Sequence, residues 1–410
     1  MQAARMGAVP QPWGRRRLRA RLLRPKAGQT RCVAMKSPPA RRRIRALLAT
    51  ACVAMLAACA SPPVDETALA LTPTQARAMI AAHLPADLKD RAGWATDIYA
   101  AFASLRIAPT AANACAAIAV TEQESSLRAD PAVPGLGAIA SREIDRRAEA
   151  AGVPLFAVHA ALRLDSPSGA SYAERIEKAK TERELSDVFD DFIGMVPLGK
   201  RLFADWNPVR TGGPMQVGVR FAEAQAAKAP YPYPVDGSIR REVFTRRGGL
   251  YFGIAHLLDY KAAYEAPLYR FADYNAGRWA SRNAALQNAI SIASGIPLAL
   301  DGDLVSGDDA DKPGNTETAA RVLGERLRLG APAIRRDLER GERDDLAETE
   351  VWVRVFALAE KLEGRTLPRA VVPRIELKGP KITRPLSTDW FAHRVDERYH
   401  RCLARAADAR

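Results

Sequence analysis

Three short polar segments constrain the possible fold of this sequence more than any other feature. The pattern of the rest of the chain mostly predicts helix. The three segments are Gln123-Glu124-Ser125-Ser126-Leu127, Gly213-Pro214-Met215-Gln216 and Asp273-Tyr274-Asn275-Ala276-Gly277. An Ala-rich run leads into the first segment, with Thr110 placed before it as a helix N-cap. Glu124 therefore stands at the C-terminal end of a predicted helix, where the helix dipole and burial both raise the pKa of a carboxyl group.

In this order the segments resemble the lytic transglycosylases of the goose-type lysozyme-like superfamily. Their pattern runs from a Glu-Ser pair ending a helix, through Gly-Leu-Met-Gln, to Ala-Tyr-Asn-Ala-Gly. The resemblance implies peptidoglycan glycan strands as substrate, with Glu124 and Tyr274 catalytic and without metal or cofactor. It also implies four substrate-binding positions, the first of them an assisting hydroxyl: Ser125, Met215, Gln216 and Asn275. The segment 249–257 resembles the family helix that precedes the Tyr-Asn motif, and we expect a structural role for it.

The resemblance also implies a mechanism in which one carboxyl acts twice, as acid and then as base, to give a 1,6-anhydro product. Glu122 lies about 200° round the helix from Glu124, so the two are not expected to share a groove. Asp273 is a candidate base for activating water, so hydrolysis stays an alternative mechanism. Ordinary packing is the alternative role for Met215, and a helix C-cap is the alternative for the Tyr274 and Asn275 segment.

The chain departs from the family pattern in three places. Pro214 stands where Leu is usual, Glu124 and Met215 are 91 positions apart, and the region from about residue 301 has no counterpart in the minimal family domain. We therefore predict a mainly α fold: a lysozyme-like transglycosylase core over 72–300, interrupted by a helical insert at 130–209, with a helical C-terminal extension over 301–410. The resemblance covers roughly 90–128 and 211–292, and as a whole the chain resembles an uncharacterised family of Gram-negative lipoproteins.

The N-terminal region predicts a lipid anchor. A basic stretch and an apolar run are followed by Leu56-Ala57-Ala58-Cys59, the pattern of a lipoprotein signal peptide over 35–58 that is cleaved before Cys59. Cys59 is then expected to carry acyl chains such as palmitate, followed by a tether over 59–71. Ala60 resembles the sorting signal for the outer membrane, which predicts a protein anchored in its inner leaflet and facing the periplasm. Residues 1–34 are interpreted as a mis-annotated or disordered leader, with Met35 as the start.

Charge excludes nucleic acid as a partner of the mature chain. The net charge of +14 comes from residues 1–58, which carry 14 basic and no acidic side chains, so 47 of each remain after cleavage. Cys115 and Cys402 are the remaining cysteines. They either pair in the oxidising periplasm, tying the C-terminal helix to the helix of Glu124, or stay as separate buried thiols. No Cys and His spacing suggests a metal site.

Helical periodicity and capping residues cover most of the mature chain. A few short strands near the active-site hairpin are the only strands expected, and 367–385 is expected to pack as an extended arm. Beyond the helix that begins after Thr72, the expected helices cover 91–105, 110–124, 141–162, 172–180, 182–193, 250–264, 280–293, 316–329, 332–340, 346–363 and 390–406.

Two other functions are consistent with the same sequence. A chain of this fold whose groove is occluded by the insert would bind peptidoglycan without cleaving it, as a scaffold lipoprotein. A helical periplasmic protein that binds an unknown protein partner, with chance matches to the motifs, would show no affinity for the cell wall.

Overall fold

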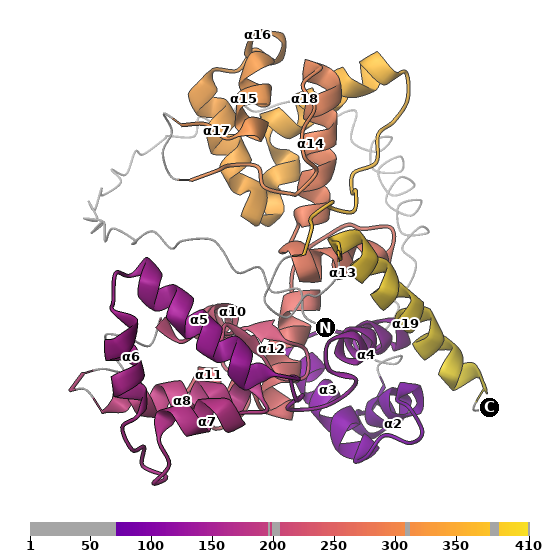
Figure 1. Cartoon of the computed structure of the whole chain (residues 1–410). Coiled ribbons are helices and arrows are strands. Elements are labelled where there is room, and N and C mark those ends of the chain that lie inside the picture. Colours follow the sequence, from indigo (N-terminus) through magenta and orange to yellow (C-terminus); the bar gives the residue numbers. More distant parts are fainter. Residues whose placement is uncertain (1–70, 196, 199–205, 308–311, 378–384, 409–410) are drawn as a thin grey trace, which may run out of the picture. The chain divides into compact units, whose positions relative to one another are not determined.

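The computed structural model describes residues 71–195, 197–198, 206–307, 312–377 and 385–408, and these are mainly helical, as predicted (Figure 1). The expected leader (1–34), signal peptide (35–58) and lipidation site Cys59 lie outside the described residues. Within the described ranges, no helix is long and apolar enough to cross a membrane.

The largest hydrophobic core surrounds α4 (Ala111–Ser125), which is buried along most of its length. Thr110 caps this helix as predicted, because its side chain accepts the backbone N–H of Asn113 at 3.1 Å. Other elements also contribute to this core, and they are α2 (Pro73–His83), α3 (Arg91–Leu105), α10 (Val219–Lys228), α11 (Ile239–Val243), α12 (Arg246–Leu258), α13 (Pro267–Ala276) and α19 (Thr388–Asp408).

A two-stranded antiparallel hairpin carries the second motif at its turn. β1 (Thr211–Gly212) pairs with β2 (Val217–Gly218), with Thr211 opposite Gly218 and Gly212 opposite Val217. This confirms the prediction that short strands occur at the hairpin that carries this motif. The turn residues Pro214 and Met215 pack against α12.

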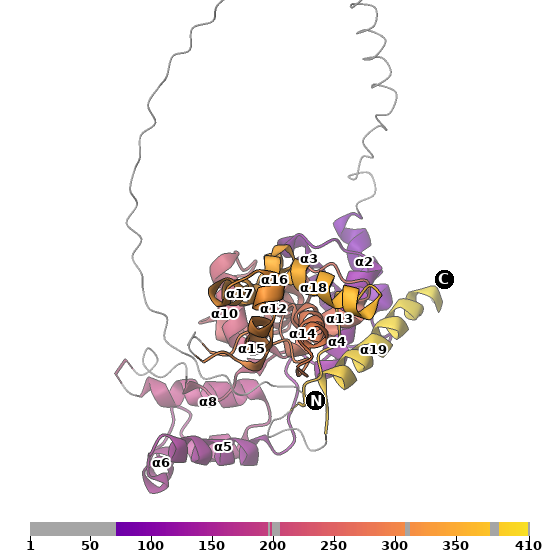
Figure 2. The same cartoon turned by 90° about the horizontal axis from the view of Figure 1, so that it is seen from above.

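The insert forms a separate small core that also takes in Val209 and Phe244. Its helices are α5 (Leu136–Ala150), α6 (Leu155–Leu162), α7 (Tyr172–Lys178) and α8 (Glu182–Gly194), which gather together in Figure 1. Figure 2 shows α5, α6 and α8 of this group from above. The expectation of one helix over 141–162 was wrong. The chain breaks between α5 and α6 at Gly152, whose φ is +69°, and Pro154 then precedes the next helix.

The C-terminal region divides between two cores. One is built by α14 (Ala280–Ser294), α15 (Asn315–Val322), α16 (Gly324–Leu327), α17 (Ala331–Leu338) and α18 (Glu350–Glu363), with the 3-10 turns η4 (Glu339–Glu342) and η5 (Asp344–Glu348) beside them. The predicted extended arm follows: Val371 donates to the carbonyl of Ser281 at 2.9 Å and Arg374 to that of Leu300 at 2.8 Å. The last helix, α19, then packs against α4 and α13 rather than with α15–α18 (Figure 1).

Several helix boundaries differ from the prediction for local reasons. α12 begins at Arg246, four residues before the expected start, because Thr245 accepts the N–H of Gly248 as an N-cap. It ends at Leu258 instead of residue 264. The expected helix over 316–329 is interrupted at Leu323, and the one over 346–363 begins with η5. α10, α11 and α13 were not predicted.

Candidate active site

Glu124 lies in the last turn of α4, with only 9% of its surface exposed. The helix ends directly after it through two residues with positive φ, Ser126 at 53° and Leu127 at 57°. Non-glycine residues rarely adopt this conformation, and two in succession mark a turn that the surrounding packing imposes. α4 therefore presents a buried carboxyl at its C-terminal end, as the sequence predicted.

Burial is the main cause that raises the pKa of Glu124, to about 8. The charge of Glu182, at the start of α8 in the insert, raises this pKa further. Within the part of the chain that the structure describes, the Oε2 atom of Glu124 is buried without a hydrogen-bond partner, so it receives no hydrogen bond there that would favour the carboxylate. A pKa of about 8 keeps most of Glu124 protonated at neutral pH, the state that a proton donor needs.

This raised pKa predicts how a Glu124→Gln variant changes stability. Because the folded-state pKa lies above the unfolded value of 4.5, the wild type loses stability as pH rises between these two values. A neutral Gln avoids this cost. We expect the free energy of unfolding of the variant to match the wild type near pH 4 and to exceed it by roughly 2–4 kcal/mol at pH 8. Urea unfolding across this pH range measures the difference, and a constant offset would mean that Glu124 ionises normally.

Tyr274 comes from α13 and is hydrogen-bonded to the hairpin. Its hydroxyl donates to the backbone carbonyl of Met215 at 2.6 Å. Burial, followed by the charge of Glu124, raises the pKa of the Tyr274 phenol well above its usual value. Because the phenol hydrogen is used by Met215, the phenol oxygen has only lone pairs to offer to a protonated Glu124. The structure thus bonds Tyr274 to the Met215 backbone and places it within electrostatic reach of Glu124.

The turn of the hairpin is held by backbone geometry. Gly213 and Gln216 both have positive φ, at 71° and 52°. Gln216 donates to the carbonyl of Gly213 from its backbone N–H at 3.1 Å and from its side chain Nε2 at 3.2 Å, while its Oε1 is buried without a partner. The Met215 side chain is fully buried in the core. Its role is therefore packing, which was the alternative left open by the sequence.

Two glycines of α12 make room for that turn. A Cβ on Gly249 would lie 2.4 Å from Pro214 Cδ, and a Cβ on Gly253 would lie 2.5 Å from both Cβ and Sδ of Met215. Their spacing of four residues places them on one face of the helix. Segment 249–257 therefore has the structural role that was expected of it.

We expect Gly253→Ala to lower the free energy of unfolding by about 1–3 kcal/mol, because the added methyl overpacks the space filled by Met215. Gly330→Ala is the matched control, since a Cβ there meets only Pro332 Cδ at 3.8 Å. Chemical denaturation of both variants measures the effect. Equal free energies of unfolding of the two variants would show that the Met215 side chain moves aside without lowering the stability.

Ser125 and Asn275 have partners within the protein. The Ser125 hydroxyl donates to the carbonyl of Thr121 at 3.0 Å and accepts the N–H of Arg128 at 3.2 Å. Asn275 Oδ1 accepts the hydroxyl of the buried Thr388 at 2.9 Å, which joins α13 to the start of α19. Both side chains are thus engaged at the ends of helices around the site. Their roles as an assisting hydroxyl and a sugar contact stay predictions.

Asp273 has a structural role. Its carboxylate accepts hydrogen bonds from the hydroxyls of Tyr260 and Tyr264, at 2.9 and 2.6 Å, and from the backbone N–H groups of Trp279 and Ser281, at 3.0 and 2.7 Å. These four donors hold the turn between α13 and α14. A carboxylate engaged in this way is poorly placed to activate water, which argues against the hydrolytic alternative.

Sequence reasoning missed two residues at the site. Glu182 had no motif to identify it and acts from a helix of the insert. The His256 ring, within segment 249–257, packs edge-on against Tyr274 with ring centroids 5.0 Å apart. Burial, followed by the charge of Arg278, lowers the pKa of His256 to about 4. The neutral ring donates from Nε2 to the Tyr274 carbonyl at 3.3 Å, so His256 positions Tyr274.

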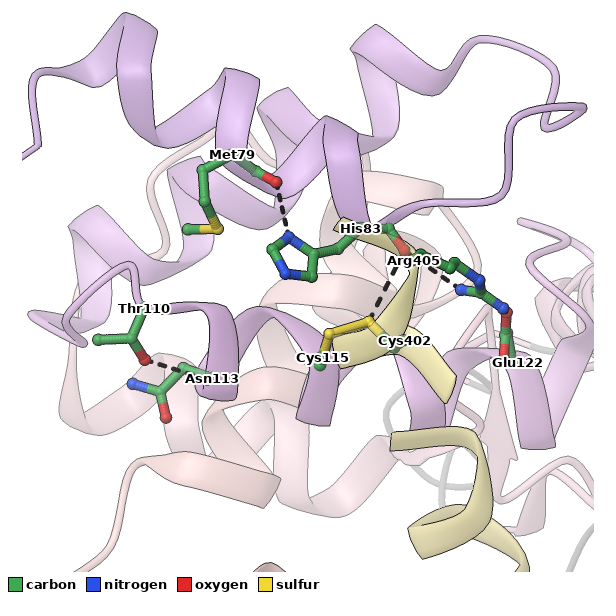
Figure 3. The surroundings of a disulfide bond; sticks show 8 residues. All are labelled: Met79, His83, Thr110, Asn113, Cys115, Glu122, Cys402 and Arg405. Carbon is green, nitrogen blue, oxygen red and sulfur yellow. Dashed lines mark hydrogen bonds and ion pairs between the residues drawn. A yellow bond between two sulfur atoms is a disulfide. The ribbon is translucent and has the colours of Figure 1, made fainter. Parts of the chain in front are cut away.

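The disulfide between Cys115 and Cys402 ties α19 to α4, with a Cα–Cα distance of 5.5 Å (Figure 3). This confirms the first of the two alternatives for these cysteines. Nearer the C-terminal end of α4, Arg405 pairs with Glu122 and donates to the carbonyl of His83 at 3.2 Å (Figure 3). Glu122 thus faces α19. Among the described residues, no group of His, Cys, Asp and Glu side chains could hold a metal ion.

Comparisons with known proteins identify relatives but no activity. A family profile described as "Protein of unknown function (DUF1615)" matches residues 87–405. A relative from Escherichia coli (strain K12), named uncharacterized protein YaiW, is 55% identical over 320 residues, which are 78% of this chain and 87% of the relative. No solved structure matches this chain.

Proposed function

The chain belongs to the DUF1615 family of proteins of unknown function, and we propose that it is a lytic transglycosylase with a lysozyme-like core that cleaves peptidoglycan glycan strands. The observation that carries this proposal is the buried Glu124 at the end of α4, whose pKa is raised to about 8. The contact of Tyr274 with the motif-bearing hairpin supports it. The order of the three motifs supports the choice of glycan as substrate.

In the proposed reaction Glu124 first donates its proton to the glycosidic oxygen that follows N-acetylmuramic acid, and the bond from C1 to that oxygen breaks. The resulting carboxylate then accepts the proton of the C6 hydroxyl of the same sugar, and O6 bonds to C1. The product is a 1,6-anhydro sugar, and Glu124 ends protonated. Burial of Glu124 favours this cycle because both steps pass through the one carboxyl group, without a second carboxylate.

Product chemistry tests this proposal. The mature chain, with Cys59→Ala for solubility, is incubated with purified sacculi, and the released muropeptides are identified by mass spectrometry. A transglycosylase releases 1,6-anhydro ends, whereas a hydrolase releases ends that have gained one water molecule. Reducing ends in place of anhydro ends would contradict the proposed mechanism and would require a base for water.

The burial of Glu124 also favours a second candidate, a scaffold protein that binds peptidoglycan without cleaving it. Only 9% of Glu124 is exposed, and the charge of Glu182 from the insert reaches it. If the insert keeps this site closed, sacculi would bind the protein and release nothing. Cosedimentation with sacculi, measured alongside release, separates this outcome from a protein with no affinity for the wall.

We further propose that the chain is an outer-membrane lipoprotein, anchored in the inner leaflet through acylated Cys59 and facing the periplasm. The basic stretch, the apolar run and Leu56-Ala57-Ala58-Cys59 support this. Membrane fractionation of cells that express Cys59→Ala tests it. We expect the variant to move to the soluble periplasmic fraction, and an unchanged distribution would contradict the anchor.

A further inference from the structure

A cavity of about 540 Å³ lies on the side of α4 that faces α19. Its walls come from the connection between α2 and α3, from the C-terminal end of α4 and from α19. It belongs to the size range of ligand sites. Six charged side chains line it: Asp87, Lys89, Glu122, Arg398, Arg401 and Arg405.

The three arginines share one face of α19, because their spacing of three and four residues corresponds to about one turn each. Such crowding is unfavourable: burial, followed by the neighbouring charges of Arg394 and Arg401, lowers the pKa of Arg398. Arg405 is the only one of the three with an ion pair among the described residues, to Glu122 (Figure 3). Like charges gathered in a concave site favour an anionic ligand.

The cavity is mixed in character. Its four cations face two carboxylates, those of Asp87 and Glu122, and its lining also includes the apolar side chains of Leu88 and Leu127. A simple anion would not require the carboxylates. A short peptide that carries several carboxylates and one ammonium group matches both signs of charge, and its apolar parts match the leucines. This is the chemistry of the stem peptides attached to glycan strands in Gram-negative walls.

Some of the residues that line the cavity are also close to Glu124 in the sequence. Ser126 and Leu127, which line it, follow Glu124 within three residues at the end of α4. Glu122 and Glu124 point to different sides of that helix end. A peptide attached to a glycan bound at Glu124 would therefore pass round the turn at Ser126 to enter the cavity. We propose that this cavity binds the acidic stem peptide of the glycan strand, an inference that rests on the proposed function.

Arg401 and Lys89 are the residues that test the proposal. Both are exposed, and neither forms an ion pair among the described residues, so their removal leaves the contacts of Arg405 and Glu122 intact. Arg401→Gln combined with Lys89→Gln removes two of the four cations. Arg146→Gln is the control, because Arg146 belongs to α5, lies outside the cavity lining and pairs with Glu143 at 2.7 Å.

Isothermal titration of the mature protein, carrying Cys59→Ala and Glu124→Gln, measures binding without cleavage. The probes are a disaccharide with its tetrapeptide, the same disaccharide without peptide, and the free tetrapeptide. We expect the double variant to bind both peptide-containing probes at least about tenfold more weakly, with binding of the bare disaccharide unchanged. Arg146→Gln should match its parent. Wild-type affinity for the free tetrapeptide should fall as salt is added.

Equal affinity of the double variant and its parent for the free tetrapeptide would overturn the proposal. So would binding of inorganic phosphate or of anionic phospholipid vesicles through Arg401 and Lys89 in the absence of peptide binding. Failure of the proposed function is a separate result, because it would appear as a lack of sacculus cleavage by the protein with intact Glu124 while the tetrapeptide still binds in the cavity.

Discussion

Glu124→Gln is expected to lower the rate of glycan cleavage by about a thousandfold, within the range observed for loss of a general acid. Gln has nearly the same shape as the protonated carboxyl and fits the same buried space, but it has no proton to transfer to the leaving oxygen. The rate of release of soluble muropeptides from sacculi measures this loss. Binding to sacculi should be retained, because the substitution leaves the surface of the protein unchanged.

Glu363→Gln is the matched control for this variant. Glu363 also ends a helix, α18, but there it is exposed and pairs with Arg365 at 3.4 Å. Its substitution should leave the rate within about twofold of the wild type, since surface changes of this kind rarely affect stability or activity. A Glu124→Gln protein that cleaves as fast as the Glu363→Gln protein would exclude Glu124 as the proton donor.

Loss of the disulfide is expected to have the largest destabilising effect. Cys115→Ala with Cys402→Ala should lower the free energy of unfolding by about 2–4 kcal/mol, because the bond closes a loop of 287 residues and limits the unfolded chain. α19 would then be held on α4 by packing and by the pair of Arg405 with Glu122. Urea unfolding with and without a reducing agent measures the effect.

The double variant should not respond to the reducing agent, whereas the wild type should fall to the same level when it is reduced. A wild-type unfolding midpoint that reductant leaves unchanged would mean that the two cysteines are separate thiols. Partial loss of cleavage is expected along with the loss of stability, because α19 supports the helix that ends at Glu124.

Local sequence signals were sufficient to predict the elements whose ends are marked by capping residues. The boundaries of α4 follow from the cap at Thr110 and from the polar residues after Glu124. The C-cap alternative for the third motif is confirmed, because α13 ends at Ala276 and Gly277 follows with a φ of +115°. α13 itself was not predicted, because it has only 10 residues and Ala266 gives it no side-chain N-cap.

The remaining features depend on contacts between distant segments, which local patterns do not encode. Asn275 is engaged by Thr388, 113 residues away. The charge of Glu182, which lies in the insert, raises the pKa of Glu124. The return of α19 to α4 was suggested by two cysteines, but composition left their pairing open. Sequence therefore identified the carboxyl and its helix, while the structure was needed to show which neighbouring polar groups are already occupied.

The protonation state of Glu124 at neutral pH is the central claim, since the first proposed step needs its proton and the second step restores it. Infrared difference spectra of the wild type and Glu124→Gln, recorded between pH 4 and pH 10, measure this state directly. The account predicts a protonated carboxyl band at pH 7 that is absent from the variant and that disappears in the wild type with a pKa near 8. A Glu124 that is already a carboxylate at pH 6 would contradict the account.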